Sequence, residues 1–245
     1  MSVHSQMINR MEEFLSCRMA EEHPNGRLHQ EVERPSIMIS REAGARGLEI
    51  GAKLVDYLTQ FDDTAEHGWA LFDQSLVTRV IETKKLPEVI REYLIPVISD
   101  TRPHEVIDTM HGTPPSEWTL FQHSADVIRR LCQLGNVIIL GRGANFLTQD
   151  LPNAFHIRLV GDPDDRAKAL ANTLGLSQAE ALAYVESTDL ARASYVRRHL
   201  HREINDPAAY HLMLNASRLD ESTAARIIGD SLMEWACGRS QTMTR

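Results

Sequence analysis

Several features that assign a chain to a familiar class are scarce or missing in this sequence. Cysteine occurs three times in 245 residues, at widely separated positions, which is typical neither of a disulfide framework nor of a closely spaced zinc site. No apolar run reaches about 18 residues, and the first residues are polar where a secretory signal needs an apolar stretch. We therefore expect a cytoplasmic protein with no membrane partner.

Positive charge is also in deficit, with 26 Lys and Arg against 34 Asp and Glu and a formal net charge of -8. Binding to nucleic acid draws its affinity from neutralising many phosphates, so we do not expect a nucleic-acid partner. The 11 histidines include no His-x-x-x-His pair with a nearby acid, so we expect no metal site of that kind. A local cluster of arginines in such a chain is informative.

What the sequence does contain is an alternation of short apolar strands with helical segments. The expected strands are residues 36–40, 137–140, 155–160 and 210–214. Asp162 and Pro163 are suited to begin a helix, and Asp220 opens a last one. Strands that alternate with helices predict an α/β fold of three layers around a mostly parallel sheet.

The first 34 residues are expected to form a helical appendage. Met7, Met11, Phe14 and Leu15 recur at helical spacing before polar residues break the pattern. Such a stripe predicts a helix docked either on the body of the protein or on a second copy in a homodimer.

A strand, a loop of small residues and a helix follow one another over residues 40–51, with the sequence SREAGARGLEIG. Successive backbone N–H groups and the helix N-terminus in such a turn form a concave site for phosphate oxygens. The candidate ligands are Gly44, Ala45, Arg46, Gly47, Leu48 and Glu49. A single Gly-x-x-Gly is weak evidence, and taken alone the loop favours an ordinary tight connection.

Four motifs in order strengthen the interpretation. They are the loop just described, Leu71-Phe72-Asp73, Gly141-Arg142-Gly143-Ala144-Asn145, and the segment from Asp189 through Arg192 to Asn215. Together they resemble the cytidylate-kinase-like family over about residues 36 to 235. The resemblance implies the P-loop fold of nucleoside-monophosphate kinases, in which a phosphate moves from ATP to CMP or a similar acceptor with Mg²⁺. It implies a kinase-like domain over residues 35–245, with a helical insertion at 74–134 and an arginine-rich lid at 189–207.

The resemblance also implies roles for individual residues. Loop residues 44–49 would hold the ATP phosphates, and Arg142 would bind the acceptor phosphate as a catalytic group. Asp73 would lie near the acceptor nucleoside or help to order the metal, with a helix cap as an equally weighted alternative.

The proposed lid helix carries Arg192, Arg197, Arg198 and Arg202 close together. The resemblance implies that Arg192 and Arg198 offset the charge that develops in the transition state. The alternative is a solvated helix face whose arginines pair with neighbouring carboxylates.

The phosphate loop departs from the pattern of a working kinase. A Walker A loop ends in Gly-Lys-Ser/Thr, whose lysine reaches the β- and γ-phosphates and whose hydroxyl binds Mg²⁺. Here Gly47 and Glu49 stand at those two positions, and Arg46 stands where the family usually keeps glycine. Arg46 either restores the cation from a shifted position or closes the phosphate site by its bulk. The sequence therefore favours an ATP-dependent nucleotide or small-metabolite kinase, with a catalytically degenerate nucleotide-binding or regulatory protein as the alternative.

Overall fold

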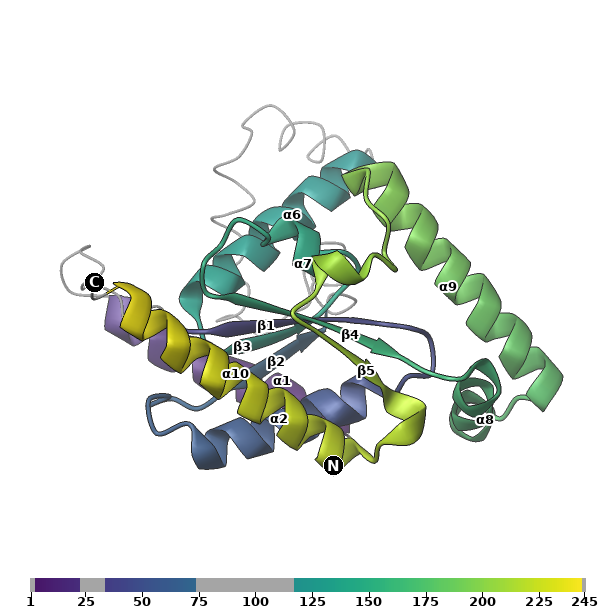
Figure 1. Ribbon diagram of the computed structural model, residues 1–245, viewed down its shortest axis with the longest axis horizontal. Helices are drawn as coiled ribbons and strands as arrows, with labels where there is room; N and C mark the ends of the chain where they lie inside the picture. The colour runs from purple at the N-terminus through teal and green to yellow at the C-terminus, as the bar shows by residue number, and fades with distance from the viewer. Residues whose placement is uncertain (1–2, 23–33, 74–116, 244–245) are drawn as a thin grey trace.

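The computed structural model describes residues 3–22, 34–73 and 117–243, and its centre is a five-stranded parallel sheet in the order β2-β3-β1-β4-β5 (Figure 1). The strands are β1 (Ser36–Arg41), β2 (Ala70–Asp73), β3 (Val137–Leu140), β4 (Ala154–Val160) and β5 (Leu212–Asn215). All four predicted strands are present and parallel, and the predicted fold class is confirmed. Strand β2 was not predicted as a strand, because Leu71-Phe72-Asp73 was identified only as a motif.

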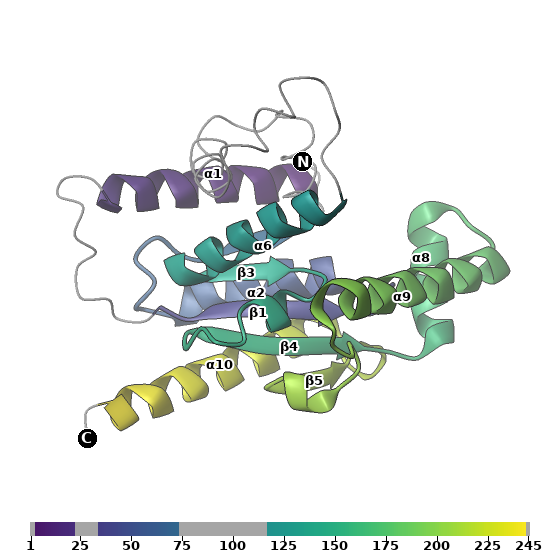
Figure 2. The same cartoon turned by 90° about the horizontal axis from the view of Figure 1, so that it is seen from above.

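Helices cover both faces of this sheet and complete the three layers (Figures 1 and 2). They are α1 (Val3–Glu22), α2 (Gly47–Phe61), α6 (Glu117–Leu134), α7 (Ala144–Leu147), α8 (Pro163–Leu174), α9 (Gln178–Leu200) and α10 (Glu221–Met243). Helices α2 and α10 pack together on one face, α6 and α7 lie on the other, and α1 contacts β2. Two short 3₁₀ helices, η1 (Pro207–Ala209) and η2 (Ala216–Arg218), flank β5.

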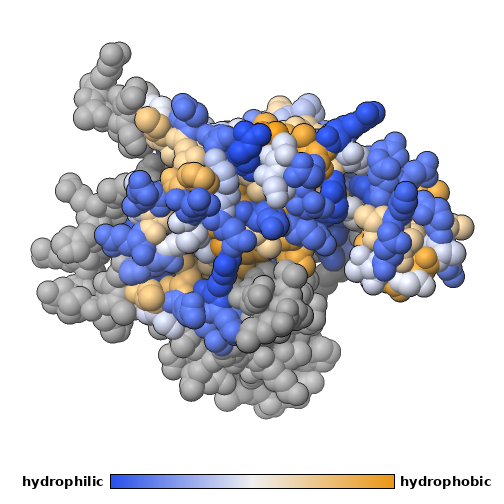
Figure 3. Space-filling view, turned by 90° about the horizontal axis from the view of Figure 1, so that it is seen from below, coloured by the Kyte–Doolittle hydropathy of each residue, from blue (hydrophilic) through white to orange (hydrophobic). Residues whose placement is uncertain are grey.

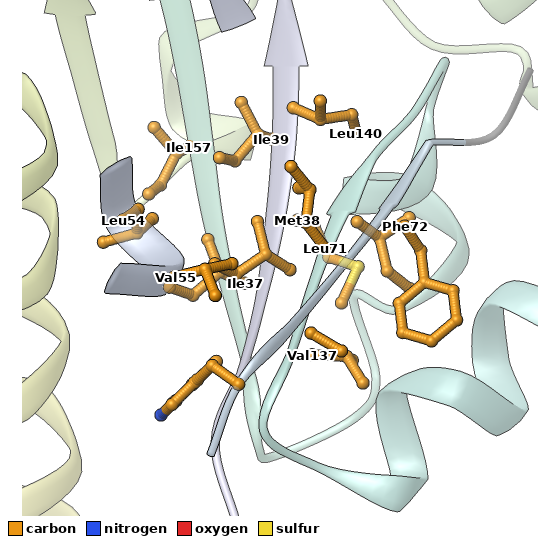
Figure 4. Close-up of a cluster of buried hydrophobic side chains, with 14 of the residues drawn as sticks. Ile37, Met38, Ile39, Leu54, Val55, Leu71, Phe72, Val137, Leu140 and Ile157 are labelled. Atoms are coloured by element: carbon orange, nitrogen blue, oxygen red, sulfur yellow. The ribbon is translucent and has the colours of Figure 1, made fainter. Parts of the chain in front are cut away.

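The core lies where the central strands meet α2 (Figure 4). Ile37, Met38 and Ile39 are consecutive in β1 and all fully buried, because both faces of a parallel sheet are covered by helices. Leu54 and Val55 of α2 complete this part of the core. This packing places the carboxyl end of β1 close to the first residue of α2, with the loop of residues 42–46 between them.

The N-terminal stripe is buried within the chain itself. Met11, Phe14 and Leu15 belong to the main core, whereas the side chain of Met7 lies outside what the structure describes. The boundary at residue 34 and a homodimer remain predictions. Of the predicted helical insertion, residues 74–116 lie outside the described part, and the rest contains α6.

Helices α8 and α9 project together from the body (Figures 1 and 3). Asp162 caps α8 by accepting hydrogen bonds from the N–H groups of Asp164 and Asp165, as expected from the sequence. A capping box between Ser177 and Glu180 begins α9. The predicted lid at 189–207 comprises the second half of α9 and the turn after it, and its role as a lid remains a prediction. Among the described helices, none is long and apolar enough to cross a membrane.

A buried histidine in β4 makes the fold sensitive to acid. His156 is 5% exposed, and its Nε2 lies 3.0 Å from Thr148 Oγ1. Since that hydroxyl donates to the Ala144 carbonyl, the imidazole must donate through Nε2–H. Burial and, secondarily, the neighbouring His211 lower the pKa of His156 to about 4.

Because the unfolded chain binds a proton at this histidine near pH 6.5 and the folded chain only near pH 4, stability should fall as pH drops through this window. We expect His156 to account for about 2 kcal/mol of the stability lost between pH 7 and pH 5. Urea unfolding of the wild type and of His156→Gln, which keeps a donor but does not titrate, measures the difference. Equal losses in the two proteins would contradict the prediction.

Candidate functional site

The loop between β1 and α2 is shaped to receive an anion. Gly44 has φ +75° and Arg46 has φ 52°, so two left-handed residues turn the chain within three positions. A Cβ on Gly44 would lie 2.5 Å from the Arg166 carbonyl oxygen, which leaves room only for glycine. In the described part of the chain, the N–H groups of Gly44 and Gly47 have no acceptor, and Gly47 begins α2. These donors and the helix N-terminus make the loop a candidate site for phosphate oxygens, as the sequence predicts.

A cavity of about 340 Å³ opens beside this loop. Its lining comes from the loop, from α8 and from η2, and includes Gly44, Ala45, Lys168, Asn172 and Ser217. Another cavity, of about 330 Å³, lies against Ala154 and His211, where β4 and β5 begin. Ligands of open α/β sheets bind at the carboxyl ends of the strands, so the cavity at the loop is the candidate site.

The beginning of the loop is tied to both projecting helices. Asp189 of α9 accepts from the Ala43 N–H at 2.7 Å and from Arg166 Nη1 at 2.6 Å. Arg166 of α8 also donates to the carbonyl oxygens of Ala43 and Gly161, each at 2.9 Å. Glu42 accepts from the Gly161 N–H at 2.9 Å. The loop therefore keeps its shape without a bound ligand, because side chains satisfy its first polar groups.

Four arginines from four elements converge beyond the carboxyl ends of the strands. They are Arg41 of β1, Arg142 after β3, Arg158 of β4 and Arg192 of α9. Arg192 Nη1 donates to the Arg41 carbonyl at 2.9 Å, and Arg158 Nη1 donates to Ser40 Oγ at 2.7 Å. Burial and then the charge of Arg41 lower the pKa of Arg192 to about 10, so it stays protonated at neutral pH.

The positive charge of this cluster exceeds the negative charge that contacts it. With Arg166, five guanidinium groups lie near the three carboxylates of Glu42, Asp73 and Asp189, so arginines outnumber acids in the described part of this cluster. Among the described residues, the buried Nε atoms of Arg158 and Arg192 have no hydrogen-bond partner. A buried donor without a partner is costly, so the cluster is suited to an anion such as a phosphate dianion.

The structure brings three of the predicted side chains to this cluster. Arg142 and Arg192 are near enough to interact electrostatically, and Asp73 Oδ2 lies 3.7 Å from Arg41 Nη2. Arg198 is exposed and follows Arg192 by six residues in α9, which displaces it about 9 Å along the helix. Arg198 therefore lies outside the cluster in this conformation.

Three of the six predicted loop positions carry large side chains, and these point in different directions. Glu49 is exposed in the first turn of α2, and Leu48 packs against the main core. Arg46 turns its guanidinium away from the loop, to Glu221 Oε1 at 2.6 Å, to the Leu219 carbonyl at 2.7 Å and to the Ala216 carbonyl. Leu48 and Arg46 can contact phosphate only through their backbone N–H groups.

Sequence reasoning missed Arg41, Arg158 and Arg166 as site residues. Arg41 stands within the Ile-Ser-Arg-Glu motif, and Arg158 lies in a buried strand whose other residues, apart from His156, are apolar. A charged residue in a buried strand is rarely placed there without a partner or a function, so Arg158 could have been found. Arg166 carries no such signal, because a helical arginine is ordinary.

A parallel sheet whose first strand runs through a phosphate-binding loop into a helix defines the class of P-loop kinase-like proteins. The cytidylate kinase-like family matches residues 36–218, about three quarters of the chain. The chain belongs to this family. No curated protein matches it.

Two solved structures show the same fold. An uncharacterized protein from Eubacterium ventriosum ATCC 27560 is 18% identical with a TM-score of 0.59, and the match covers 81% of this chain and 98% of that one. A gluconokinase from Sinorhizobium meliloti 1021 is 11% identical with a TM-score of 0.50, covering 86% of this chain and 99% of that one. At these identities the likeness concerns the fold alone.

The contacts of Arg46 predict how its replacements differ in stability. Arg46→Ala removes the bonds to Glu221 and to the two carbonyls but keeps the left-handed backbone, so we expect a loss of about 1–2 kcal/mol. Arg46→Gly removes the same bonds and relieves a strain of about 1 kcal/mol, so it should be the more stable of the two. Urea unfolding of both variants measures this order. A glycine variant no more stable than the alanine variant would show that the left-handed backbone costs nothing here.

Proposed function

We propose that this protein transfers a phosphoryl group from ATP to a nucleoside monophosphate such as CMP, or to a related small metabolite. The observation that carries the proposal is the under-compensated arginine cluster beside a loop of unpaired backbone N–H groups. Membership of the kinase-like family supports the same class of reaction. The partners we propose are therefore small molecules, and a cytoplasmic location remains a prediction.

On the donor side, the loop would bind the ATP phosphates through the N–H groups of residues 44–49. The cavity against α8 and η2 has room for the nucleoside, with Lys168 and Asn172 in its lining. Among the described residues, no group of three or more histidine, cysteine or acidic side chains could hold a metal by itself. This fits Mg²⁺, which is usually bound by one or two carboxylates together with the nucleotide phosphates. Asp73 and Glu49 are the candidate carboxylates, and the ion would neutralise phosphate charge.

On the acceptor side, Arg142 and Arg192 would hold the phosphate that receives the transferred group. A cluster of several arginines favours an acceptor that already carries a phosphate over an uncharged one. An oxygen of the acceptor phosphate would attack the γ-phosphorus as the bond to the β–γ bridging oxygen breaks. The arginines would orient the two reactants and offset the charge on the equatorial oxygens.

The second candidate function is nucleotide binding without turnover. Glu49 supports it, because its carboxylate lies in the first turn of α2, close to where the donor phosphates would bind. Asp189 also supports it, because its carboxylate already occupies the Ala43 N–H of the loop. Both features weaken phosphate binding unless a cation or a movement of α9 compensates.

Calorimetric titration with ATP and Mg²⁺, and with each nucleoside monophosphate, separates these functions. We expect binding of both ligand classes and turnover with at least one acceptor. Binding of ATP without turnover would identify the degenerate protein. If neither ligand class binds, both proposals fail.

Removal of a cluster arginine should lower activity without lowering stability. Arg142→Ala and Arg192→Ala should each reduce kcat by roughly thirty- to a thousand-fold, because charge-assisted bonds to the transferring phosphate are lost. The melting temperature should stay the same or rise, since a like charge leaves a repulsive cluster. Arg197→Ala is the matched control, because Arg197 lies on the same helix, is exposed and pairs with Glu203 at 2.9 Å. A similar loss of kcat in the control would contradict a specific role for the cluster.

A further inference from the structure

The side chain of Arg41 passes directly over Gly47. A Cβ on Gly47 would lie 3.1 Å from Cγ of Arg41, 3.4 Å from its Cδ and 3.5 Å from its Cβ. The Arg41 side chain is 16% exposed, so its aliphatic stem fills this space rather than extending into solvent. A side chain at residue 47 would therefore fit only if the Arg41 stem moved by a few tenths of an ångström.

Position 47 is where a Walker A loop carries its lysine. In this chain α2 begins at Gly47 and is preceded by the left-handed Arg46, which matches the glycine and lysine that end a Walker A loop. The Cβ of a lysine at residue 47 would press against the Arg41 stem, which would have to shift. The two side chains thus begin in the same place beside the loop.

The guanidinium of Arg41 reaches the end of the neighbouring strands. Its Nη1 donates to the Gly141 carbonyl at 3.2 Å, and its Nη2 lies 3.7 Å from Asp73 Oδ2. Both contacts are long for bonds of a guanidinium, so its donors are incompletely satisfied. The Arg41 carbonyl accepts from Arg192, which fixes the backbone from which the side chain extends.

The other cations near the loop are committed elsewhere. Arg46 binds Glu221 and the carbonyls around η2. Arg166 binds Asp189 and the Ala43 carbonyl, and Arg158 lies in β4, where it binds Ser40 and Asn205. The three atoms that lie nearest to a Cβ at the lysine position all belong to the Arg41 stem.

We propose that Arg41 supplies the positive charge that the Walker lysine supplies in other P-loop kinases, binding the β- and γ-phosphates of the donor. The loop has moved its cation from the first residue of the helix to the last residue of the strand. Gly47 is the complementary change that makes room for it. This inference rests on the proposed function, since it names the cation of the same donor site.

The test exchanges the two side chains. Arg41→Met keeps an apolar stem over Gly47 and removes the charge, so it should weaken binding of inorganic triphosphate at least tenfold with little change in melting temperature. Gly47→Lys alone should also bind poorly, because its stem collides with Arg41. The double variant Arg41→Ala with Gly47→Lys frees the space and returns the lysine, so it should bind triphosphate at least tenfold more tightly than Arg41→Ala. Arg10→Ala, which removes an exposed arginine paired with Asp56 at 2.8 Å, is the matched control for net charge.

The readouts separate this inference from the proposed function. Triphosphate binding by calorimetry needs no acceptor, whereas turnover requires both substrates. Loss of binding in Arg41→Met and its recovery in the double variant would support the inference even if the wild type does not turn over, in which case the kinase function fails. Wild-type turnover with undiminished triphosphate binding in Arg41→Met would overturn the inference and leave the function standing. A double variant that binds no better than Arg41→Ala, or a wild type that binds no triphosphate, would also overturn it.

Discussion

The mutual repulsion of arginines gathered at the carboxyl edge of the sheet is the constraint on which the site depends. Guanidinium groups repel one another, and burial strengthens the repulsion because less water screens it. The sheet nevertheless brings Arg41 and Arg158 together, because β1 and β4 are paired in parallel register and end at the same edge. The stability of the surrounding core must offset this repulsion. A bound phosphate would remove it, and that is the physical reason for placing the ligand here.

At the same edge of the sheet, side-chain contacts link the loop to the projecting helices α8 and α9. Asp189 contacts the loop backbone and Arg166, and Arg192 contacts the Arg41 carbonyl one turn further along α9. Any displacement of α9 must therefore break charge-assisted bonds to the loop. Conversely, an anion in the loop competes with the Asp189 carboxylate for the same region. On the proposed function, phosphate binding and the position of α9 would be coupled through these contacts.

The contacts of Arg46 bear on the two explanations for its presence in a loop that lacks the Walker lysine. The sequence shows that residue 47 is glycine, and two explanations for Arg46 were open. In the structure Arg46 stabilises the turn after β5 instead, by contacts with residues about 170 positions away along the chain. Such contacts have no local signature. The loop could thus be recognised from the sequence, but the cation that serves it could not.

Local rules determined most of the architecture. The strands at β1, β3, β4 and β5 were predictable because both faces of a parallel sheet are buried and their apolar runs are short and continuous. The cap of α8 was predictable because Asp162 and Pro163 satisfy backbone requirements within one turn. The loop and the motif around Arg142 were identified from their resemblance to a family whose order of motifs the chain keeps. Only the tertiary structure decided which arginines share a site, because convergence depends on strand order and on helices packed from distant parts of the sequence. Arg198 and Arg192 are equivalent in the sequence, and their separation arises from the direction in which α9 crosses the edge of the sheet.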